Sequence, residues 1–464
     1  MNHNYFKINN IFITLLIFYI GFIGFVLTLE INLILKFSFV LNLVPILSLT
    51  YYYLNFQTFS IANGAVIIFF FLFYFLAPVL QLDSDSNMLL NTVKCSNNLL
   101  LLSNLYVFIF MSIYFITLIL LNKSRIKIKV HSIDFQKIKI LPILIILSIV
   151  ISQKAFSEMT TIFSTLQNEF EIDSNERIMV MFERKVMNMI PFVTLSAFVI
   201  TERRNTYLVL IFAILLICIF LTKNPLLDRR NALGPIYISL LILMFKDYFT
   251  KNIRIFTLFF IMMVIFFPLT SLLTHTVVGS WQEQSINYTE LIKNHFIDLH
   301  YDAWANIAAS INYVERNGFS FGNQLLGSLS FWFPRSLWEN KPISTGELLG
   351  NFLMQFETLH FNNISATIVV EGYIDFGFVG VIIYGILLAL FTSKLDRMYS
   401  EGDVFSKIFT VYSSVFLFFI LRGALMPAVA YLFGAWLSII ILPNAIVTIC
   451  TINFKSEWKS IKKL

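Results

Sequence analysis

Acidic, basic and aromatic side chains gather between positions 300 and 380, in a chain that is otherwise almost uniformly apolar. His300 and Asp302 stand near the start of this stretch, and Glu371 and Asp375 stand near its end. Carboxylates and imidazoles are common proton donors and acceptors in general acid–base catalysis. A long polar stretch between two apolar segments therefore predicts a catalytic site.

Glu371 is one candidate for the catalytic base, because it lies at the predicted mouth of an apolar span. It shares one helix face with Asp375, four residues later, and a carboxylate near lipid can have the raised pKa that suits a base. The alternative is a solvated helix start, where the helix dipole favours acids. His300, beside Asp302, is the second candidate, since imidazole titrates near neutrality; its alternative is a structural or exposed loop histidine.

Four arginines, Arg229, Arg230, Arg335 and Arg422, each adjoin an apolar segment. The planar fork of a guanidinium binds phosphate oxygens bidentately. These arginines could therefore hold a phosphorylated lipid at the level of the membrane surface. The alternative is that they only extend toward lipid headgroups.

The stretch from Gly327 to Pro342, GSLSFWFPRSLWENKP, resembles the central signature of the O-antigen polymerase (Wzy-type) family. The resemblance continues through ISTGE at 343–347 and from Glu371 to Gly380. HYDAW at 300–304 and Arg422-Gly423 are similar to weaker markers of the family.

The family is also associated with an Arg that is followed by ten residues and then a Gly, in two different loops. That spacing occurs here at Arg316…Gly327 and at Arg335…Gly346. Both copies fall in one predicted loop, so the chain departs from the family's pattern in this respect.

The resemblance implies an enzyme that joins oligosaccharide repeat units, with donor and acceptor both carried on polyprenyl pyrophosphate. Arg335, with Arg229, Arg230 and Arg422, would then hold the diphosphates, and Glu371 or His300, with Asp302 nearby, would take the acceptor's proton. The other candidate substrate-binding residues are Arg316, Lys341, Trp338 and Tyr373. Trp304, Trp332, Trp338 and Tyr373 could stack on sugar rings, although Trp and Tyr also form belts at membrane interfaces.

A lipid-linked pyrophosphate is an activated donor, so the resemblance implies no cofactor and no metal. It does imply partners: membrane lipid, a chain-length regulator and a flippase that supplies the repeat units.

The elements that must position these residues are transmembrane helices. Of the 464 residues, 58% are hydrophobic and only 13% are charged, and the mean hydropathy is +0.78. Soluble domains have about 25% charged residues, so this composition excludes an ordinary soluble protein. The composition predicts an all-α polytopic membrane protein with about twelve transmembrane helices and a large, partly helical loop.

A transmembrane helix needs about 20 apolar residues, and twelve segments qualify. They are 11–29, 37–54, 61–82, 98–121, 140–156, 187–201, 207–222, 232–246, 255–273, 366–393, 408–422 and 426–452. Basic residues crowd 123–139 and 455–463, which the positive-inside rule places in the cytoplasm. Both termini are then cytoplasmic, and the long loop lies on the opposite side of the membrane. The family resemblance implies that this is a bacterial inner membrane and that the loop is periplasmic.

Three regions follow from this count of spans. Residues 1–273 hold nine spans, 274–365 form the large periplasmic loop, and 366–464 hold three spans and a basic tail. Within the loop we expect helix from Tyr288 to Val314, a glycine-rich turn from Asn317 to Gly327, and a short helix from Asn351 to Leu359.

Several other functions find little support in the sequence. The pI of about 9.0 does not predict nucleic-acid binding, because no basic run is interleaved with exposed aromatic residues. The spacing of Asp83 and Asp85 is that of a metal-binding DxD motif, but we expect it in a short outer loop as a polar turn. The three cysteines are too scattered for a disulfide framework or a metal cluster.

Two alternatives remain for a membrane protein with this loop. A ligase that transfers finished polymer to lipid A core would share the topology and the need to hold a diphosphate. A flippase or other transporter of lipid-linked oligosaccharides is the second. Transporters usually carry polar or broken helices at mid-membrane, whereas most of these spans have no charged residue in their cores.

Overall fold

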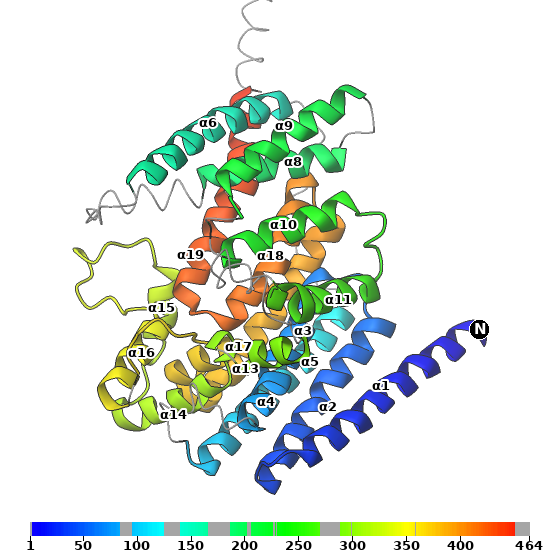
Figure 1. The fold of residues 1–464 in the computed structure, drawn as a ribbon, viewed down its shortest axis with the longest axis vertical. Coiled ribbons are helices and arrows are strands. Elements are labelled where there is room, and N and C mark those ends of the chain that lie inside the picture. The colour runs from blue at the N-terminus through cyan, green and yellow to red at the C-terminus, as the bar shows by residue number, and fades with distance from the viewer. Residues whose placement is uncertain are drawn as a thin grey trace, which may run out of the picture. The chain divides into compact units, whose positions relative to one another are not determined.

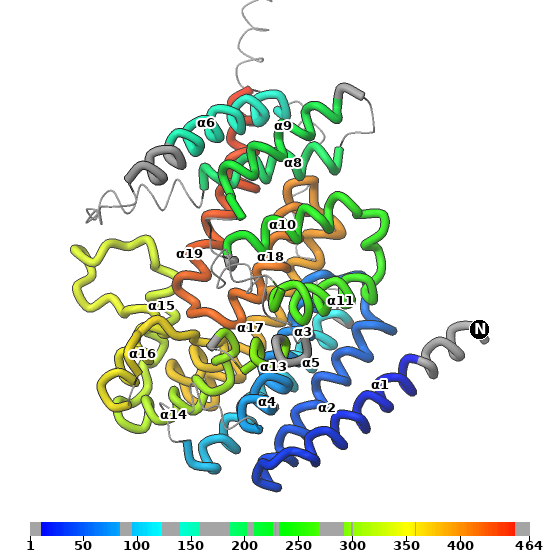
Figure 2. Tube along the Cα trace, in the orientation of Figure 1, coloured from blue at the N-terminus to red at the C-terminus, as the bar shows by residue number. Residues whose placement is uncertain are grey.

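The computed structural model describes residues 2–83, 95–124, 140–165, 186–201, 206–225, 228, 230–269, 288–297, 299–357 and 359–450. Within these ranges every element of regular structure is helical (Figure 1), and Figure 2 traces the path of the chain. The predicted basic segment after Ser124, Asp85 of the DxD motif, Arg229 and the C-terminal tail lie outside the described residues.

In the described part of the chain, eight helical segments are long and apolar enough to cross a membrane. They are Ile11–Thr28, Leu33–Asn55, Ile61–Asp83, Asn97–Asn122, Asn252–Leu269, Ile368–Glu401, Val404–Arg422 and Leu425–Cys450. This all-helical architecture is that of a multi-pass membrane protein. The other four predicted spans coincide with shorter apolar helices, at Leu141–Ser157, Met187–Thr201, Leu208–Thr222 and Ala232–Met244. The total of twelve therefore stays a prediction.

The chain forms two compact units that alternate along the sequence. The first comprises residues 1–126, 249–393 and 417–429, and the second comprises 127–248, 394–416 and 430–464. All the candidate site residues except Arg229 and Arg230 belong to the first unit.

The apolar body of the first unit is built around α3. Its helices are α1 (Asn2–Thr28), α2 (Leu33–Asn55), α3 (Ile61–Phe71), α4 (Ala77–Asp83), α5 (Asn97–Ser124) and α11 (Asn252–Ile261). Nearly every residue of α3 is buried, as expected of a helix that is apolar on all sides. It packs against α2 and α11, while α2 also packs against α1 and α5.

The polar stretch of the first unit forms four short helices: α13 (Tyr288–Ile297), α14 (Ala305–Asn317), α15 (Asn323–Leu329) and α16 (Thr345–Phe356). The helix expected from 288 to 314 is interrupted before α14, and the one expected at 351–359 begins earlier, at Thr345. The expected glycine turn is shorter than predicted, because Gly327 lies inside α15. α13 packs on α4, and α14 packs on α5 and α16.

Trp304 lies in the turn that directly precedes α14. Its side chain is fully buried, its ring lies 5.4 Å from that of Phe39, and its Nε1 donates a hydrogen bond to Asn104 Oδ1 at 2.8 Å. Asn104 also accepts from Asn42 Nδ2 at 3.1 Å, so the indole joins a buried polar contact between α2 and α5. Trp304 is thus an anchor of the fold, and its burial rules out the predicted stacking on a sugar.

Helix α17 (Ile368–Glu401) contains a sharp break at Phe376 and Gly377. Gly377 has φ 60° and ψ −139°, a conformation that L side chains rarely adopt. The break folds the short piece 368–375 against the longer piece that follows: a Cβ added at Gly380 would lie 1.8 Å from the carbonyl oxygen of Gly372. The expected single span at 366–393 therefore begins with a separate turn of helix that carries Glu371 and Asp375.

Two further helices follow, α18 (Val404–Arg422) and α19 (Leu425–Trp436). The second unit includes 394–416, the chain from Ala430 onward, and α6 (Leu141–Thr165), α8 (Ile190–Thr201), α9 (Thr206–Thr222) and α10 (Arg230–Met244). Within this unit α8 packs against α6, α9 and α10. Ser148 donates a hydrogen bond to Thr194 Oγ1 at 2.9 Å between α6 and α8.

Candidate active site

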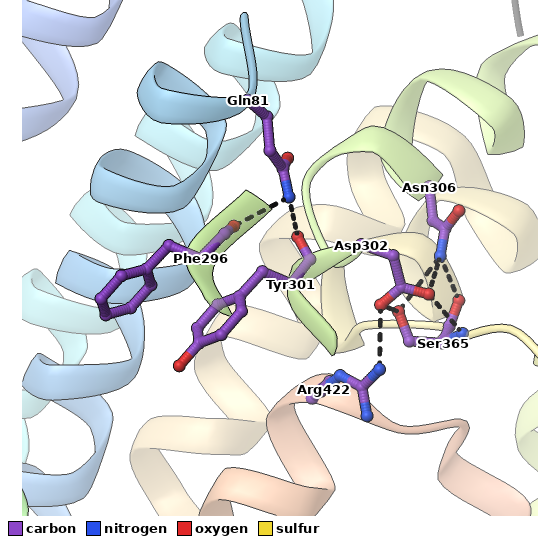
Figure 3. Close-up of polar contacts among 7 residues, drawn as sticks. All are labelled: Gln81, Phe296, Tyr301, Asp302, Asn306, Ser365 and Arg422. Carbon is purple, nitrogen blue, oxygen red and sulfur yellow. Dashed lines mark hydrogen bonds and ion pairs between the residues drawn. The ribbon is translucent and has the colours of Figure 1, made fainter. Parts of the chain in front are cut away.

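An ion pair between Asp302 and Arg422 lies at the centre of the candidate site (Figure 3). Arg422 Nη2 is 3.3 Å from Asp302 Oδ1. Asp302 lies three residues before the start of α14, and Arg422 is the last residue of α18. The carboxylate is buried, whereas 34% of the Arg422 side chain is exposed. The pair thus combines an enclosed anion with a cation that a ligand can reach.

Three neutral donors complete the surroundings of the Asp302 carboxylate. Ser365 donates twice, from Oγ to Oδ1 at 2.5 Å and from its backbone N–H to Oδ2 at 3.0 Å. Asn306 Nδ2 donates to Oδ2, also at 3.0 Å. Figure 3 shows Asp302 between Arg422 on one side and Asn306 and Ser365 on the other. Both carboxylate oxygens are therefore engaged in hydrogen bonds, and Oδ1 also meets the Arg422 guanidinium.

The turn that carries His300 and Tyr301 is tied to α4. Gln81 Nε2 donates to the carbonyl oxygens of Phe296 at 3.3 Å and Tyr301 at 3.2 Å (Figure 3). Burial raises the pKa of the Tyr301 phenol, and the positive charge of Arg422 opposes that rise only in part. Tyr301 therefore stays a neutral hydroxyl.

Glu371 is fully buried, with 0% of its surface exposed. Its Oε1 accepts a hydrogen bond from the backbone N–H of Leu425 at 2.7 Å, and its Oε2 accepts from Thr345 Oγ1 at 2.6 Å. Leu425 opens α19, three residues after Arg422. The two buried acids therefore hold opposite ends of the turn at 422–425, Asp302 by a side chain and Glu371 by the backbone.

Asp375 has a different set of partners from Glu371, although the two lie four residues apart. Its carboxylate accepts from the backbone N–H groups of Gln324 and Leu325, each at 3.1 Å, and from the hydroxyls of Ser320 and Tyr384. The two amides belong to the first turn of α15, where backbone donors have no partner within the helix. Asp375 thus acts as a cap for α15. It is fully buried, so it is not the acid at a solvated helix start that the sequence left as the alternative.

Arg335 and Lys341 organise the segment that resembles the polymerase signature. The Arg335 guanidinium donates to the carbonyl oxygens of Lys341 at 2.7 Å and Pro342 at 3.2 Å. Lys341 Nζ donates to those of Phe331 at 2.7 Å and Phe333 at 2.8 Å. Burial, and then the nearby charge of Arg335, lowers the pKa of Lys341. Arg335 remains exposed on its outer side, and a guanidinium has five N–H donors, so it can also meet an anion.

The remaining predicted residues of this unit lie in varied surroundings. His300 is exposed, and its ring lies 6.3 Å from that of His295. Arg316 sits on the ring of Phe356, with Cζ 4.5 Å from the ring centroid. Tyr373 is buried, with its ring 4.9 Å from that of Tyr106. Trp338 is half-buried in the segment that Arg335 and Lys341 organise.

Two of the predicted arginines, Arg229 and Arg230, have side chains that lie outside the described part of the structure. Arg229 lies outside the described residues, as does the side chain of Arg230, whose backbone begins α10. Both belong to the second unit. Among the described residues, no group of three or more His, Cys, Asp or Glu side chains could hold a metal ion.

Sequence reasoning missed the residues that position the acids, chiefly Asn306, Ser365 and Thr345. One signal was present: Asn306 follows Asp302 by four residues, a spacing that places both on one side of a helical turn. Ser365 and Thr345 carried no such signal, because they meet the acids across 63 and 26 residues of chain.

Comparison of the chain with protein-family models, with curated proteins and with solved structures found no match. The resemblance of residues 327–347 to the O-antigen polymerase signature therefore stays a prediction.

Proposed function

We propose that this protein is a membrane glycosyltransferase that polymerises oligosaccharide repeat units carried on polyprenyl pyrophosphate. The observation that supports this best is the Asp302–Arg422 pair. A buried carboxylate fixes one edge of the guanidinium, while about a third of the side chain remains exposed. An anchored and reachable guanidinium at the end of a membrane-spanning helix suits the diphosphate of a lipid carrier.

In the proposed reaction, a hydroxyl of the acceptor's terminal sugar attacks the anomeric carbon of the donor glycan. The bond between that carbon and the phosphate oxygen breaks, and polyprenyl pyrophosphate leaves with the electron pair. Arg422, assisted by Arg335, stabilises the negative charge that grows on the leaving group. The products are a longer glycan on the acceptor's carrier and a free carrier pyrophosphate.

His300 is the proposed acceptor of the proton from the attacking hydroxyl. It is exposed and only two residues from Asp302, whereas Glu371 is fully buried with a hydrogen bond to each carboxylate oxygen. We therefore give Glu371 the task of holding the turn at 422–425. Lys341, Trp338 and Tyr373 shape the surroundings of the substrate, and Arg316 supports the packing of α14 on α16.

The proposal includes a topology and a location. The four shorter apolar helices also cross the membrane, which gives twelve spans with both termini in the cytoplasm of a bacterium. Residues 288–365 then face the periplasm, where lipid-linked repeat units but no nucleotide sugars occur. Arg229 and Arg230 face the same side. A chain-length regulator and a repeat-unit flippase are the partners that such a reaction would use.

Turnover of purified protein tests the proposal. The wild-type protein in lipid vesicles, supplied with lipid-linked repeat units and no nucleotide, should yield a ladder of polymer. Arg422→Ala should lower the rate by about 10²–10³-fold, the usual cost of losing one donor to a developing charge. Arg397→Ala, a change of the same type in α17, should be harmless. Absence of polymer with the wild type, or equal rates for the two variants, would overturn the proposal.

The same experiment separates the ligase. A ligase would leave the repeat units unjoined and would need lipid A core as the acceptor. If product formed only when that acceptor was added, the polymerase reading would be replaced by the ligase.

A further inference from the structure

Large apolar side chains lie exposed along residues 319–337 of the polar stretch. Trp332 is 68% exposed, Leu337 73% and Phe321 80%. The full set is Phe319, Phe321, Leu326, Leu329, Trp332 and Leu337, which we call the apolar loop surface. Figure 1 shows the loop after α15, drawn in yellow, projecting from the helices beside it. None of these side chains takes part in the proposed reaction.

The loop at 330–342 satisfies its own backbone with its own cations. The carbonyl oxygens of Phe331, Phe333, Lys341 and Pro342 accept hydrogen bonds from Lys341 Nζ and the Arg335 guanidinium, at 2.7 to 3.2 Å. Lys341 and Pro342 are themselves buried, whereas Arg335, Glu339 and Asn340 are exposed beside Leu337. The bonds therefore fix the shape of a loop whose outer side carries both apolar and charged groups, a combination that suits the boundary between lipid and water.

The apolar loop surface is continuous with a membrane-spanning helix. A Cβ added at Gly322 would lie 2.7 Å from the ring of Phe376, and one added at Gly377 would lie 2.8 Å from the ring of Phe319. The turn at 318–322 thus packs on the break in α17. Immediately beyond the break, Phe378 and Val379 are exposed on the long piece of that helix. The turn at 318–322 therefore lies beside the exposed apolar start of the long α17 piece.

The backbone conformation of Phe321 also favours the exposure of its side chain. Its φ is +50°, a left-handed conformation that is unfavourable for a residue with a side chain. The strained residue presents an aromatic ring outward rather than into the core. Such a cost is expected where the outward side chain has something to bind.

We propose that the apolar loop surface inserts into one leaflet of the membrane. This is the leaflet on the same side of the membrane as the polar residues 288–365, to which the surface belongs. Its occupant is the acyl-chain layer of the bilayer lipids. Trp332 would lie near the headgroups, where indole rings are favoured, and Leu326, Leu329 and Leu337 would reach the acyl chains. The insertion holds the 330–342 loop against the membrane. It does not depend on the proposed function.

A fluorescent label placed on the loop tests the insertion. In a variant whose three cysteines are changed to serine, Leu337→Cys is labelled with an environment-sensitive dye and reconstituted into vesicles. Phe378→Cys, on the exposed start of the long α17 piece, is the lipid-facing control. Asn317→Cys, at the exposed end of α14, is the water-facing control. Lipids that carry a nitroxide on the acyl chain serve as the quencher.

The Leu337 label should be quenched by the nitroxide lipid to within about twofold of the Phe378 label, and several-fold more than the Asn317 label. Quenching equal to that at Asn317 would overturn the proposal. A second result would also overturn it. In that result the label emits as in an apolar site, nitroxide lipid does not quench this emission, and the emission weakens when the protein is diluted in lipid. That second result would assign the surface to contact between two copies of the chain. All three positions are exposed, so the labels should leave the fold intact, which the thermal unfolding midpoint checks.

Discussion

Arg422 Nη2 lies 3.3 Å from Asp302 Oδ1, an ion pair between residues 120 positions apart in sequence. The pair is asymmetric, because Asp302 is buried with three further donors whereas Arg422 is partly exposed. Because of this asymmetry, we expect Asp302 to matter more for stability and Arg422 to matter more for activity.

Asp302→Ala should destabilise the protein more than Arg422→Ala does. Loss of the carboxylate leaves the backbone N–H of Ser365 without its acceptor and deprives Asn306 of one, and each such buried group costs about 1–3 kcal/mol. Loss of the guanidinium leaves the buried carboxylate without its countercharge but with three of its four donors, so we expect it to cost less than loss of the carboxylate itself. Thermal unfolding in detergent measures both. Equal losses would contradict the asymmetry.

Glu371→Gln should retain turnover and most of the stability, whereas Glu371→Ala should lower stability by about 1–3 kcal/mol. The glutamine oxygen can still accept from Leu425 N–H, and its amide N–H can donate to Thr345 Oγ1, whose own hydrogen can turn to Gln324 Oε1. Alanine leaves the Leu425 N–H without this acceptor. Thr345→Val should lower stability in the same direction, whereas Thr345→Ser keeps the hydroxyl and serves as the control. A stable but inactive Glu371→Gln would instead indicate that Glu371 is the catalytic base.

His300→Ala should reduce turnover by about 10²–10⁴-fold, the usual contribution of a general base, with little change in stability because the side chain is exposed. His360→Ala, an exposed histidine in the segment before α17, is the matched control. Rates of polymer formation in vesicles give the comparison. If both variants turned over at the wild-type rate, the proton would have to go elsewhere.

Asp375→Ala should loosen the start of α15. The change removes the acceptor of the Gln324 and Leu325 amides, and loss of a helix cap costs about 0.5–2 kcal/mol. Hydrogen exchange at these two amides should become at least several-fold faster, while exchange in α14 stays the same. Unchanged exchange at Gln324 and Leu325 would show that Asp375 does not cap the helix.

Cys95 should react slowly with alkylating reagents at neutral pH. Burial, and to a lesser extent the charge of Glu357, raises the pKa of its thiol to about 12, against about 8.5 for a free cysteine. Only the thiolate reacts, so at pH 8 the reactive fraction is roughly a thousandfold smaller than in the unfolded chain. The rate should still rise tenfold per pH unit at pH 10. Iodoacetamide labelling of a Cys218→Ser, Cys450→Ser variant measures it; a rate that levels off near pH 9 would contradict the burial.

Much of the transmembrane architecture could be predicted from sequence, because the spans are long apolar segments without charged residues in their cores. The segment expected at 98–121 is the span Asn97–Asn122, and the one expected at 61–82 is Ile61–Asp83. The break in α17 could not be predicted, since Gly377 lies at the start of an apolar run that follows Asp375, where glycine also serves helix packing. Its need for a positive φ becomes visible only when the chain folds back on itself.

For the candidate site, sequence indicated the chemical residues but not their contacts. Asp302, Arg422 and Glu371 were each recognisable as polar groups near apolar segments. Their arrangement around the turn at 422–425 depends on contacts across 54 and 120 residues, which no local pattern encodes. Arg335 was expected to bind phosphate, and its bonds to the carbonyls of Lys341 and Pro342 depend on how the loop closes.

Binding of polyprenyl pyrophosphate tests the central claim most directly, because it measures the contribution of the Arg422 guanidinium to binding, apart from the later chemical steps. Purified wild-type protein, Arg422→Ala and Arg397→Ala would be titrated in nanodiscs with the carrier pyrophosphate alone. We predict that Arg422→Ala weakens binding at least tenfold, while Arg397→Ala binds as the wild type does. If the Arg422→Ala protein bound the carrier as tightly as the wild type, Arg422 would not be the residue that holds the diphosphate.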